Sequence, residues 1–147
     1  MTAVLAIVHA GLAAAWVGGM AYSLFVVQPK LKRYFGADAA GREALTTVIA
    51  SGNRWKVVGL IAAIAVSGLG LLLLGDAANW WIHAIKGVLL LMATGIFWYV
   101  SWKHWPVRVF ATAAEVPALH RRLIVLATTM LGLAGLAFAL GVLANHL

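Results

Sequence analysis

The sequence predicts an all-α integral membrane protein, folded as an antiparallel four-helix bundle with both termini on the outer side of the membrane. Its 147 residues are 64% hydrophobic and only 10% charged, whereas a water-soluble domain has roughly a quarter of its residues charged. Four apolar segments have the length of about 20 residues that a helix needs to cross a bilayer. We therefore expect a single transmembrane domain over residues 1–147, with spans at 2–27, 55–74, 81–101 and 123–144.

The first apolar segment, residues 2–27, is interpreted as a retained helix. A secretory signal peptide begins with a basic stretch and ends at a cleavage site. This segment has no basic stretch at its start and no clear cleavage site. His9 and Trp16 also interrupt its apolar run.

The basic residues predict which side of the membrane each connection faces. All eleven Lys and Arg residues except Lys86 lie in, or at the edges of, the connections after the first and third spans. The positive-inside rule places these connections in the cytoplasm and both termini outside. The net charge of +7 is then a topology signal and a contact for anionic headgroups of the lipid bilayer, so no nucleic-acid partner is expected. Tryptophans mark both interfaces, with Trp80 and Trp81 outside and Trp55, Trp102 and Trp105 inside.

Each cytoplasmic connection has its own expected structure. Residues 37–53 are more polar than the spans, and Leu45, Val48 and Ile49 share one helical face. This pattern predicts a cytoplasmic helical extension that starts near Asp38 and is either separate from the second span or continuous with it. Residues 103–122 contain two prolines and are expected to be partly irregular. His104 and His120 of this connection are expected to contact solvent or headgroups, and Glu115 is expected to pair with a neighbouring base.

Small residues at four-residue spacing predict how the helices pack. Without a hydrophobic force between helices in lipid, close approach at small side chains holds a bundle together. A structural role is the expected one for these stripes, which are Gly11, Ala15 and Gly19; Gly59, Ala63 and Ser67; and Gly132, Gly135 and Ala139.

Three ionisable residues lie inside the predicted spans, near the outer face. At 1.5 Å per residue, His9 is about 10 Å below the outer end of its span, His83 about 5 Å and Lys86 about 9 Å below Trp80. Ionisable groups at such depth are costly and usually face the bundle interior with a partner. The two histidines therefore come from different helices to a similar depth on the same side.

The helical faces suggest space beside each histidine. Trp16 shares the face of His9, opposite the Gly11 stripe. Ala13 follows His9 by four residues and Gly87 follows His83 by four. Together with the tryptophan, these small residues would leave room for a flat group between the helices.

The residue types allow several chemistries. Neutral histidine is an axial ligand for haem iron and a good copper ligand, and Lys86 could bind a porphyrin propionate or transfer protons. The alternatives are structural: His9 bonded to a backbone carbonyl, His83 at the interface, and Lys86 reaching the outer headgroups. Asp76 and Asn79 in the outer connection are expected to cap helix ends, and His146 lies at the outer face.

Three stretches carry a resemblance to a known family. "HAGLAAAWVGGMAYSLFVVQP" resembles the first helix of copper-resistance protein D (CopD) domains, "NRWKVVGLIAAIAVSGLGLLL" the second and "WWIHAIKGVLLLMATGIFWYVSWKHWP" the third. HemJ-type protoporphyrinogen oxidases have a comparable first-helix histidine and a Trp-x-His segment with a nearby lysine. The resemblance implies a helical membrane bundle linked to copper handling or to b-type haem, with His9 and Lys86 in the matching positions. HemJ-type proteins place the third-helix histidine and lysine two apart, whereas here they are three apart.

Three functions remain in view. The first is a membrane-embedded haem b protein of the CopD/HemJ-like kind, an electron-transfer protein or an oxidoreductase, with His9 and His83 as axial ligands and Lys86 and Trp16 lining the site. The second is a copper-binding or copper-transport protein using the same histidines, although soft Cu(I) prefers sulfur ligands and the chain has no cysteine. The third is a cofactor-free accessory or assembly subunit.

Cellular context and excluded chemistry follow from the same residues. We expect a multi-pass protein of a bacterial inner (plasma) membrane, with a membrane redox partner and a homo-oligomer both open. No Ser/His/Asp spacing, carboxylate pair, phosphate loop or HExxH zinc motif is present, which argues against a hydrolase.

Overall fold

The computed structural model describes residues 2–50, 52–74 and 80–144, and every element in them is a helix. Four helices are long and apolar enough to cross a membrane: Thr2–Phe35, Asn53–Leu74, Trp80–Val109 and Val116–Leu143. The predicted all-helical class and the number of membrane-spanning helices are confirmed, and three of the four helices run several residues beyond the predicted spans.

The first long helix contains α1 (Thr2–Tyr22), a π-helical turn (Ser23–Val27) and α2 (Gln28–Phe35). Pro29 lies just after the π turn. Proline lacks the amide hydrogen and crowds the carbonyl four residues earlier, and a π turn absorbs this mismatch without ending the helix. The helix therefore continues past the predicted end at residue 27, and Gly36, with a φ of 51°, ends it.

The predicted cytoplasmic helix is α3 (Ala39–Ala50). The Asp38 carboxylate accepts a hydrogen bond from the backbone N–H of Gly41 at 2.8 Å, so Asp38 caps the helix as the sequence predicts. Gly52 has a φ of 77° and precedes α4 (Asn53–Leu74). This turn separates α3 from the second span.

The third long helix has the same three parts as the first: an α-helix, a π-helical turn and a second α-helix. It contains α5 (Trp80–Tyr99), a π-helical turn (Val100–His104) and α6 (Trp105–Val109), with Pro106 after the π turn. The last helix, α7 (Val116–Ala144), begins well before residue 123. The second basic connection is thus more helical than expected, because Pro106 follows a π turn and Pro117 lies in the first turn of α7, where no amide partner is lost.

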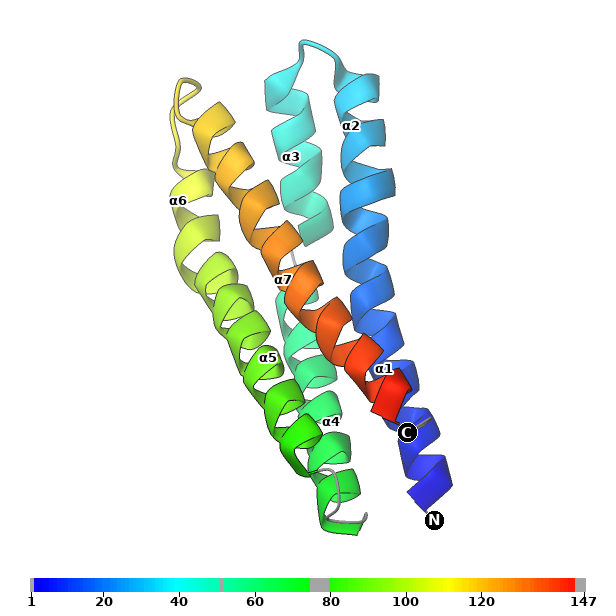
Figure 1. Ribbon diagram of the computed structural model, residues 1–147. Helices are drawn as coiled ribbons and strands as arrows, with labels where there is room; N and C mark the ends of the chain where they lie inside the picture. Colours follow the sequence, from blue (N-terminus) through cyan, green and yellow to red (C-terminus); the bar gives the residue numbers. More distant parts are fainter. Residues whose placement is uncertain (1, 51, 75–79, 145–147) are drawn as a thin grey trace.

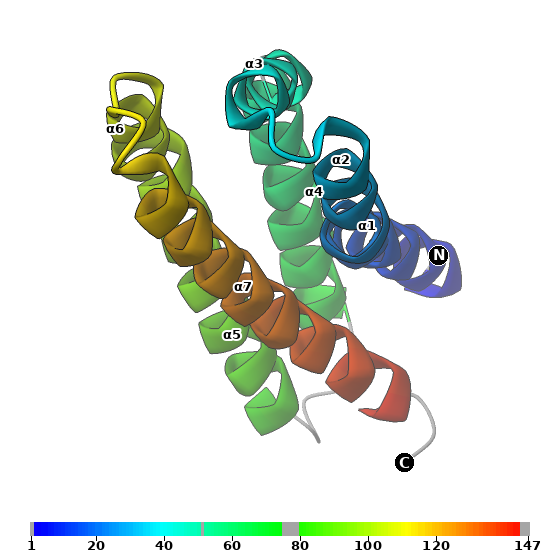
Figure 2. The ribbon, with the colours of Figure 1, turned by 90° about the horizontal axis from the view of Figure 1, so that it is seen from above.

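The helices alternate in direction, so that two ends of the bundle can be named (Figure 1). At the N-terminal end, α1 and α5 begin and α4 and α7 end; at the basic end lie α2, α3 and α6. α1 packs along α4, α5 packs along α7, and α1 also contacts α7. Seen from above, α7 runs between α5 and α1 (Figure 2). The bundle is therefore two helix pairs joined mainly through α7.

A core of large apolar side chains fills the middle of the bundle. All four spanning helices contribute to it, and Ala93 has no exposed surface. The buried members are Trp16, Ile61, Ile64, Ala93, Phe97, Met130 and Ala134. This core keeps the helices apart at mid-height.

The predicted glycine contacts are wrong for most positions. Gly11, Ala15 and Gly19 are exposed on α1, and a Cβ added at Gly11, Gly19, Gly59, Gly132 or Gly135 would meet nothing within 4 Å. The reason is that Trp16 and other large side chains occupy the interface, which turns the small-residue stripe of α1 outward. The close approaches occur instead at Gly68 and Gly70 of α4 and at Gly141 of α7.

Candidate functional site

His9 of α1 faces α4, near the N-terminal end. Its Nδ1 lies 2.8 Å from the hydroxyl oxygen of Ser67. The His9 ring also lies against Gly68, because a Cβ added at Gly68 would be 3.1 Å from the ring Cε1. The face predicted for His9 is confirmed, since His9 is half-buried and Trp16 is buried while Gly11 is exposed.

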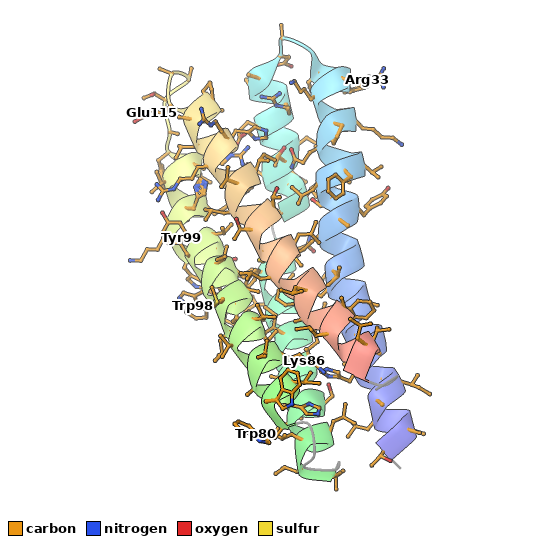
Figure 3. All side chains as sticks on the ribbon, viewed as in Figure 1. Arg33, Trp80, Lys86, Trp98, Tyr99 and Glu115 are labelled. Carbon is orange, nitrogen blue, oxygen red and sulfur yellow. The ribbon has the colours of Figure 1, made fainter. Side chains whose placement is uncertain are left out.

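Lys86 of α5 reaches across to α7. A Cβ added at Gly141 would lie 3.2 Å from Nζ of Lys86, and Figure 3 places this side chain near the N-terminal end. The ammonium lies within electrostatic range of both His9 and His83. The three ionisable residues that sequence reasoning placed at a common depth are thus brought together.

The polar partners of these groups are few. Ser67 is bonded to His9, whereas no described residue forms a hydrogen bond or ion pair with Lys86 or His83. The carboxylates of the described residues, Asp38, Glu43 and Glu115, belong to the basic end. Asp76, Asn79 and His146 lie outside the described residues.

The other predicted lining residues lie elsewhere. Trp16 belongs to the mid-bundle core, 5% exposed, seven residues or about 10 Å deeper than His9 along α1. Gly87 is exposed, and a Cβ there would meet nothing within 4 Å. The space beside His83 therefore opens toward the outside of the bundle rather than between α1 and α5.

The donor chemistry at this end fits a haem. Two imidazoles offer nitrogen ligands from different helices, and haem iron takes such axial ligands. The adjacent ammonium suits the carboxylates of a porphyrin. Among residues 2–50, 52–74 and 80–144, no three His, Cys, Asp or Glu side chains gather as a metal-ion site, so a bare metal ion would find at most two of these ligands.

Ser67 is the partner that sequence reasoning missed. The four-residue spacing places Ser67 in a packing stripe, yet it lies seven residues before the end of α4 at Leu74, or about 10 Å from that end. This is the depth of His9 on the antiparallel neighbour. A hydroxyl at matched depth in an otherwise apolar helix was the available signal.

A second polar cluster lies at the basic end, built on Arg108 of α6. Arg108 is 3% exposed, and its guanidinium binds Glu43 of α3 through two bonds, Nε–Oε1 at 2.6 Å and Nη2–Oε2 at 2.7 Å. Nη2 also lies 3.3 Å from Nδ1 of His120 on α7. This cluster joins three helices, whereas the sequence pattern indicates only a topology signal for its arginine.

The two histidines of the second connection do not lie free in solvent. His104 is 4% exposed, contrary to the expectation of solvent or headgroup contact, and its Nε2 has no hydrogen-bond partner in the described part of the chain. The π turn that precedes Pro106 contains His104. Arg108 follows His104 by four residues and is buried as well, so that both side chains lie on one face of the third long helix. His120 is half-buried beside the same guanidinium.

Tryptophan and arginine side chains also contact one another toward the basic end of the bundle. Trp98 stacks on Trp102 with centroids 4.0 Å apart, and the Arg54 guanidinium lies 4.7 Å from the centre of the Trp102 ring. Trp102 therefore joins α4 to the third long helix through a cation–π contact.

Glu115 is paired with Thr112 rather than with a base. Its carboxylate accepts hydrogen bonds from the Thr112 hydroxyl at 2.7 Å and from the Thr112 backbone N–H at 2.9 Å. These bonds favour the charged form and lower the pKa of Glu115 below its usual value. The pair closes the turn that leads into α7, and the Thr-x-x-Glu spacing was its sequence signal.

Comparison with protein-family models, with curated proteins and with solved structures finds no match to this chain. The CopD/HemJ-like resemblance therefore stays a prediction.

Proposed function

We propose that this chain is a membrane-embedded haem b protein that carries electrons, with the haem near the outer face of a bacterial inner membrane. His9 and His83 would hold the iron, and Lys86 would pair with a propionate. When bound, haem supplies a one-electron couple. The protein's own part is to present two neutral imidazoles, to place a cation beside them and to shield the group with apolar helices.

The observation that carries the proposal is the convergence of two imidazoles and one ammonium at one end of an apolar bundle. Lys86 lies within electrostatic range of both histidines. An intramembrane ionisable residue normally has a partner, yet no described residue bonds Lys86. A ligand with carboxylates would supply that partner.

The same charge distribution ranks haem above copper. A copper ion bound by His9 and His83 would sit beside the positive Lys86, with no carboxylate among the described residues of that end to offset it. Cu(I) also prefers sulfur ligands, and the chain has no cysteine. A porphyrin reverses this argument, because its propionates bring negative charge to the lysine.

The proposed orientation puts the basic end in the cytoplasm. Ten of the eleven Lys and Arg residues lie in or beside the two connections at that end, which the positive-inside rule assigns to the cytoplasm. The haem would then face the outer side, and a membrane redox partner would have to approach it there.

The test is an optical spectrum of detergent-purified protein, expressed with ample haem, before and after dithionite. We expect a Soret band and sharpened α and β bands on reduction, and loss of the bands in His9→Ala and in His83→Ala. His120→Gln, at the opposite end, is the matched control and should keep the spectrum. A colourless wild-type protein overturns the haem proposal; stoichiometric copper would then support a copper role, and absence of both would leave an accessory bundle.

A further inference from the structure

We infer that Ser67 and Gly68 of α4 form a seat that holds His9 with its proton on Nδ1, leaving the lone pair of Nε2 free to bind a metal centre. Ser67 is thus a positioning residue. The identity of that centre rests on the proposed function, whereas the state of the His9 ring does not.

Counting protons at Ser67 gives the direction of its bond to His9. A hydroxyl has one proton to donate and two lone pairs to accept with. The Ser67 hydroxyl lies 2.7 Å from the carbonyl oxygen of Ala63 and 3.1 Å from that of Ile64. Both carbonyls can only accept, so the Ser67 hydroxyl donates its single proton to this pair of oxygens.

The bond between Ser67 and His9 then has one consistent assignment. Because the Ser67 hydroxyl already donates to a carbonyl, its oxygen accepts a hydrogen bond from Nδ1–H of His9 at 2.8 Å. The reverse assignment, with Ser67 donating to a bare Nδ1, would leave both carbonyl contacts without a proton. In lipid, where no water can replace a lost bond, the arrangement that forms more bonds is favoured.

Gly68 fixes the position of the ring. A Cβ added there would be 3.1 Å from Cε1 and 3.8 Å from Nε2 of His9. Because the first distance is shorter than an ordinary contact, even an alanine would push the ring by a few tenths of an ångström. The Ser67 hydroxyl thus sets the tautomer of His9. The absence of a Cβ at Gly68, a glycine, sets the position of the His9 ring.

Such a seat is what a metal-binding histidine requires. The second ring nitrogen of a ligating histidine usually donates to a fixed acceptor, which sets the tautomer and the ring orientation. Loss of such a partner typically weakens metal affinity by about 10–100-fold. The seat therefore predicts which nitrogen of His9 would bind and how strongly it depends on Ser67.

The decisive experiment is nitrogen NMR of the full-length, ligand-free protein in lipid, with ¹⁵N-labelled histidine. His9 signals are identified as those lost in His9→Gln. We expect a protonated Nδ1 and an unprotonated Nε2 in the wild type, a shift toward protonated Nε2 in Ser67→Ala, and return of the wild-type pattern in Ser67→Thr, which keeps a hydroxyl.

Thr129→Ala is the matched control. Thr129 also donates its hydroxyl to the carbonyl four residues earlier, Val125, at 3.0 Å, but on an exposed face of α7. It should leave the His9 signals unchanged. A wild-type His9 protonated on Nε2, or a Ser67→Ala spectrum equal to the wild type, would overturn the seat.

Ligand binding separates the two proposals. If the wild type binds haem, Ser67→Ala should hold it about 10–100-fold more weakly and Ser67→Thr should restore affinity. If His9 is protonated on Nδ1 but the protein binds no haem, the haem proposal is wrong and the seat is still supported. Unchanged haem affinity in Ser67→Ala, with a changed tautomer, would show that Nε2 of His9 is not the ligand and would overturn the role of the seat in binding.

Discussion

Lys86 is the residue whose placement is hardest to explain by structure alone. Its ammonium lies against Gly141 of α7 and has no bonding partner among the described residues. On translocon scales an unpaired Lys at mid-membrane costs about 2.5–3.5 kcal/mol, and less near an interface. A charge kept at such a cost is more readily explained by a ligand than by the fold, which would be held as well by an apolar side chain.

Lys86→Met is therefore expected to raise the stability of the ligand-free protein and to weaken ligand binding. Removing the unpaired charge should add about 1–2 kcal/mol to the free energy of unfolding, measured by denaturation in mixed micelles. Haem retained after purification should fall, because a propionate loses its cation. Lys103→Met, at the basic end, serves as the comparison. A lysine that only reaches the headgroups would give no gain in stability and no loss of haem.

Glu115 offers a pH-dependent prediction at a single side chain. Its pKa is lowered by the Thr112 hydroxyl and then by the Thr112 backbone N–H. Since the folded pKa is depressed, the stabilisation is present above the ordinary Glu pKa of about 4.3 and is lost as the pH falls through the folded pKa. Carboxyl NMR titration should show this lowered pKa, and Thr112→Val should move it back toward the ordinary value. An equal pKa in the two proteins would argue against the bonds between Thr112 and Glu115.

At the scale of elements, the ion pair between α3 and α6 attaches α3 to the rest of the bundle. Arg108 is buried and Glu43 keeps only 20% of its side chain exposed. Breaking one partner of a buried pair costs about 3–5 kcal/mol, because the other charge is left alone. α3 otherwise makes few contacts with α2 and α4, so its position depends on this pair.

Glu43→Ala should therefore release α3 while leaving the spans in place. We expect a loss of about 3 kcal/mol in unfolding free energy and faster amide hydrogen exchange from residue 39 to residue 50, with α4 and α5 little changed. Glu115→Ala, which removes a carboxylate that bonds only within its own turn, is the matched control. Unchanged exchange in α3 would mean that other contacts hold it.

The helices themselves were largely predictable and their ends were not. Composition and length are enough for the four spans, and Asp38 marks the start of α3 through its cap. The predicted ends of the first and third spans are wrong, because both helices continue through a proline, Pro29 or Pro106. A proline normally ends a helix, and no local sequence signal predicts the π turn that precedes each proline. The glycine stripe of α1 failed for a different reason: small residues permit a close contact without requiring it, and Trp16 decided which face turned inward.

The candidate site was predictable in depth but not in partners. His9, His83 and Lys86 could be placed near one end from residue counting alone. The Ser67 bond joins residues 58 positions apart, and the Arg108–Glu43 pair joins residues 65 apart. Such pairings depend on how the helices rotate against one another, which the apolar pattern of these helices leaves weakly determined.

For the whole molecule, the orientation can be tested with single cysteines, because the chain has none of its own. Ala113→Cys, in the connection before α7, and Thr2→Cys, at the start of α1, are both exposed. In intact cells a membrane-impermeant maleimide should label the Thr2 variant and spare the Ala113 variant, with both labelled after the membrane is opened. The reverse pattern would place the candidate site in the cytoplasm and refute the proposed topology.

The unequal lengths of the helices decide which of them responds to bilayer thickness. α4 has 22 residues and is about 33 Å long, close to the hydrocarbon thickness of about 30 Å. The first long helix has 34 residues and spans about 51 Å, so it has surplus at the basic end. Hydrophobic mismatch in a thicker membrane would therefore act mainly on α4, the helix that carries Ser67 and Gly68. Lipid chain length thus becomes a means of straining the His9 bond without changing a single residue.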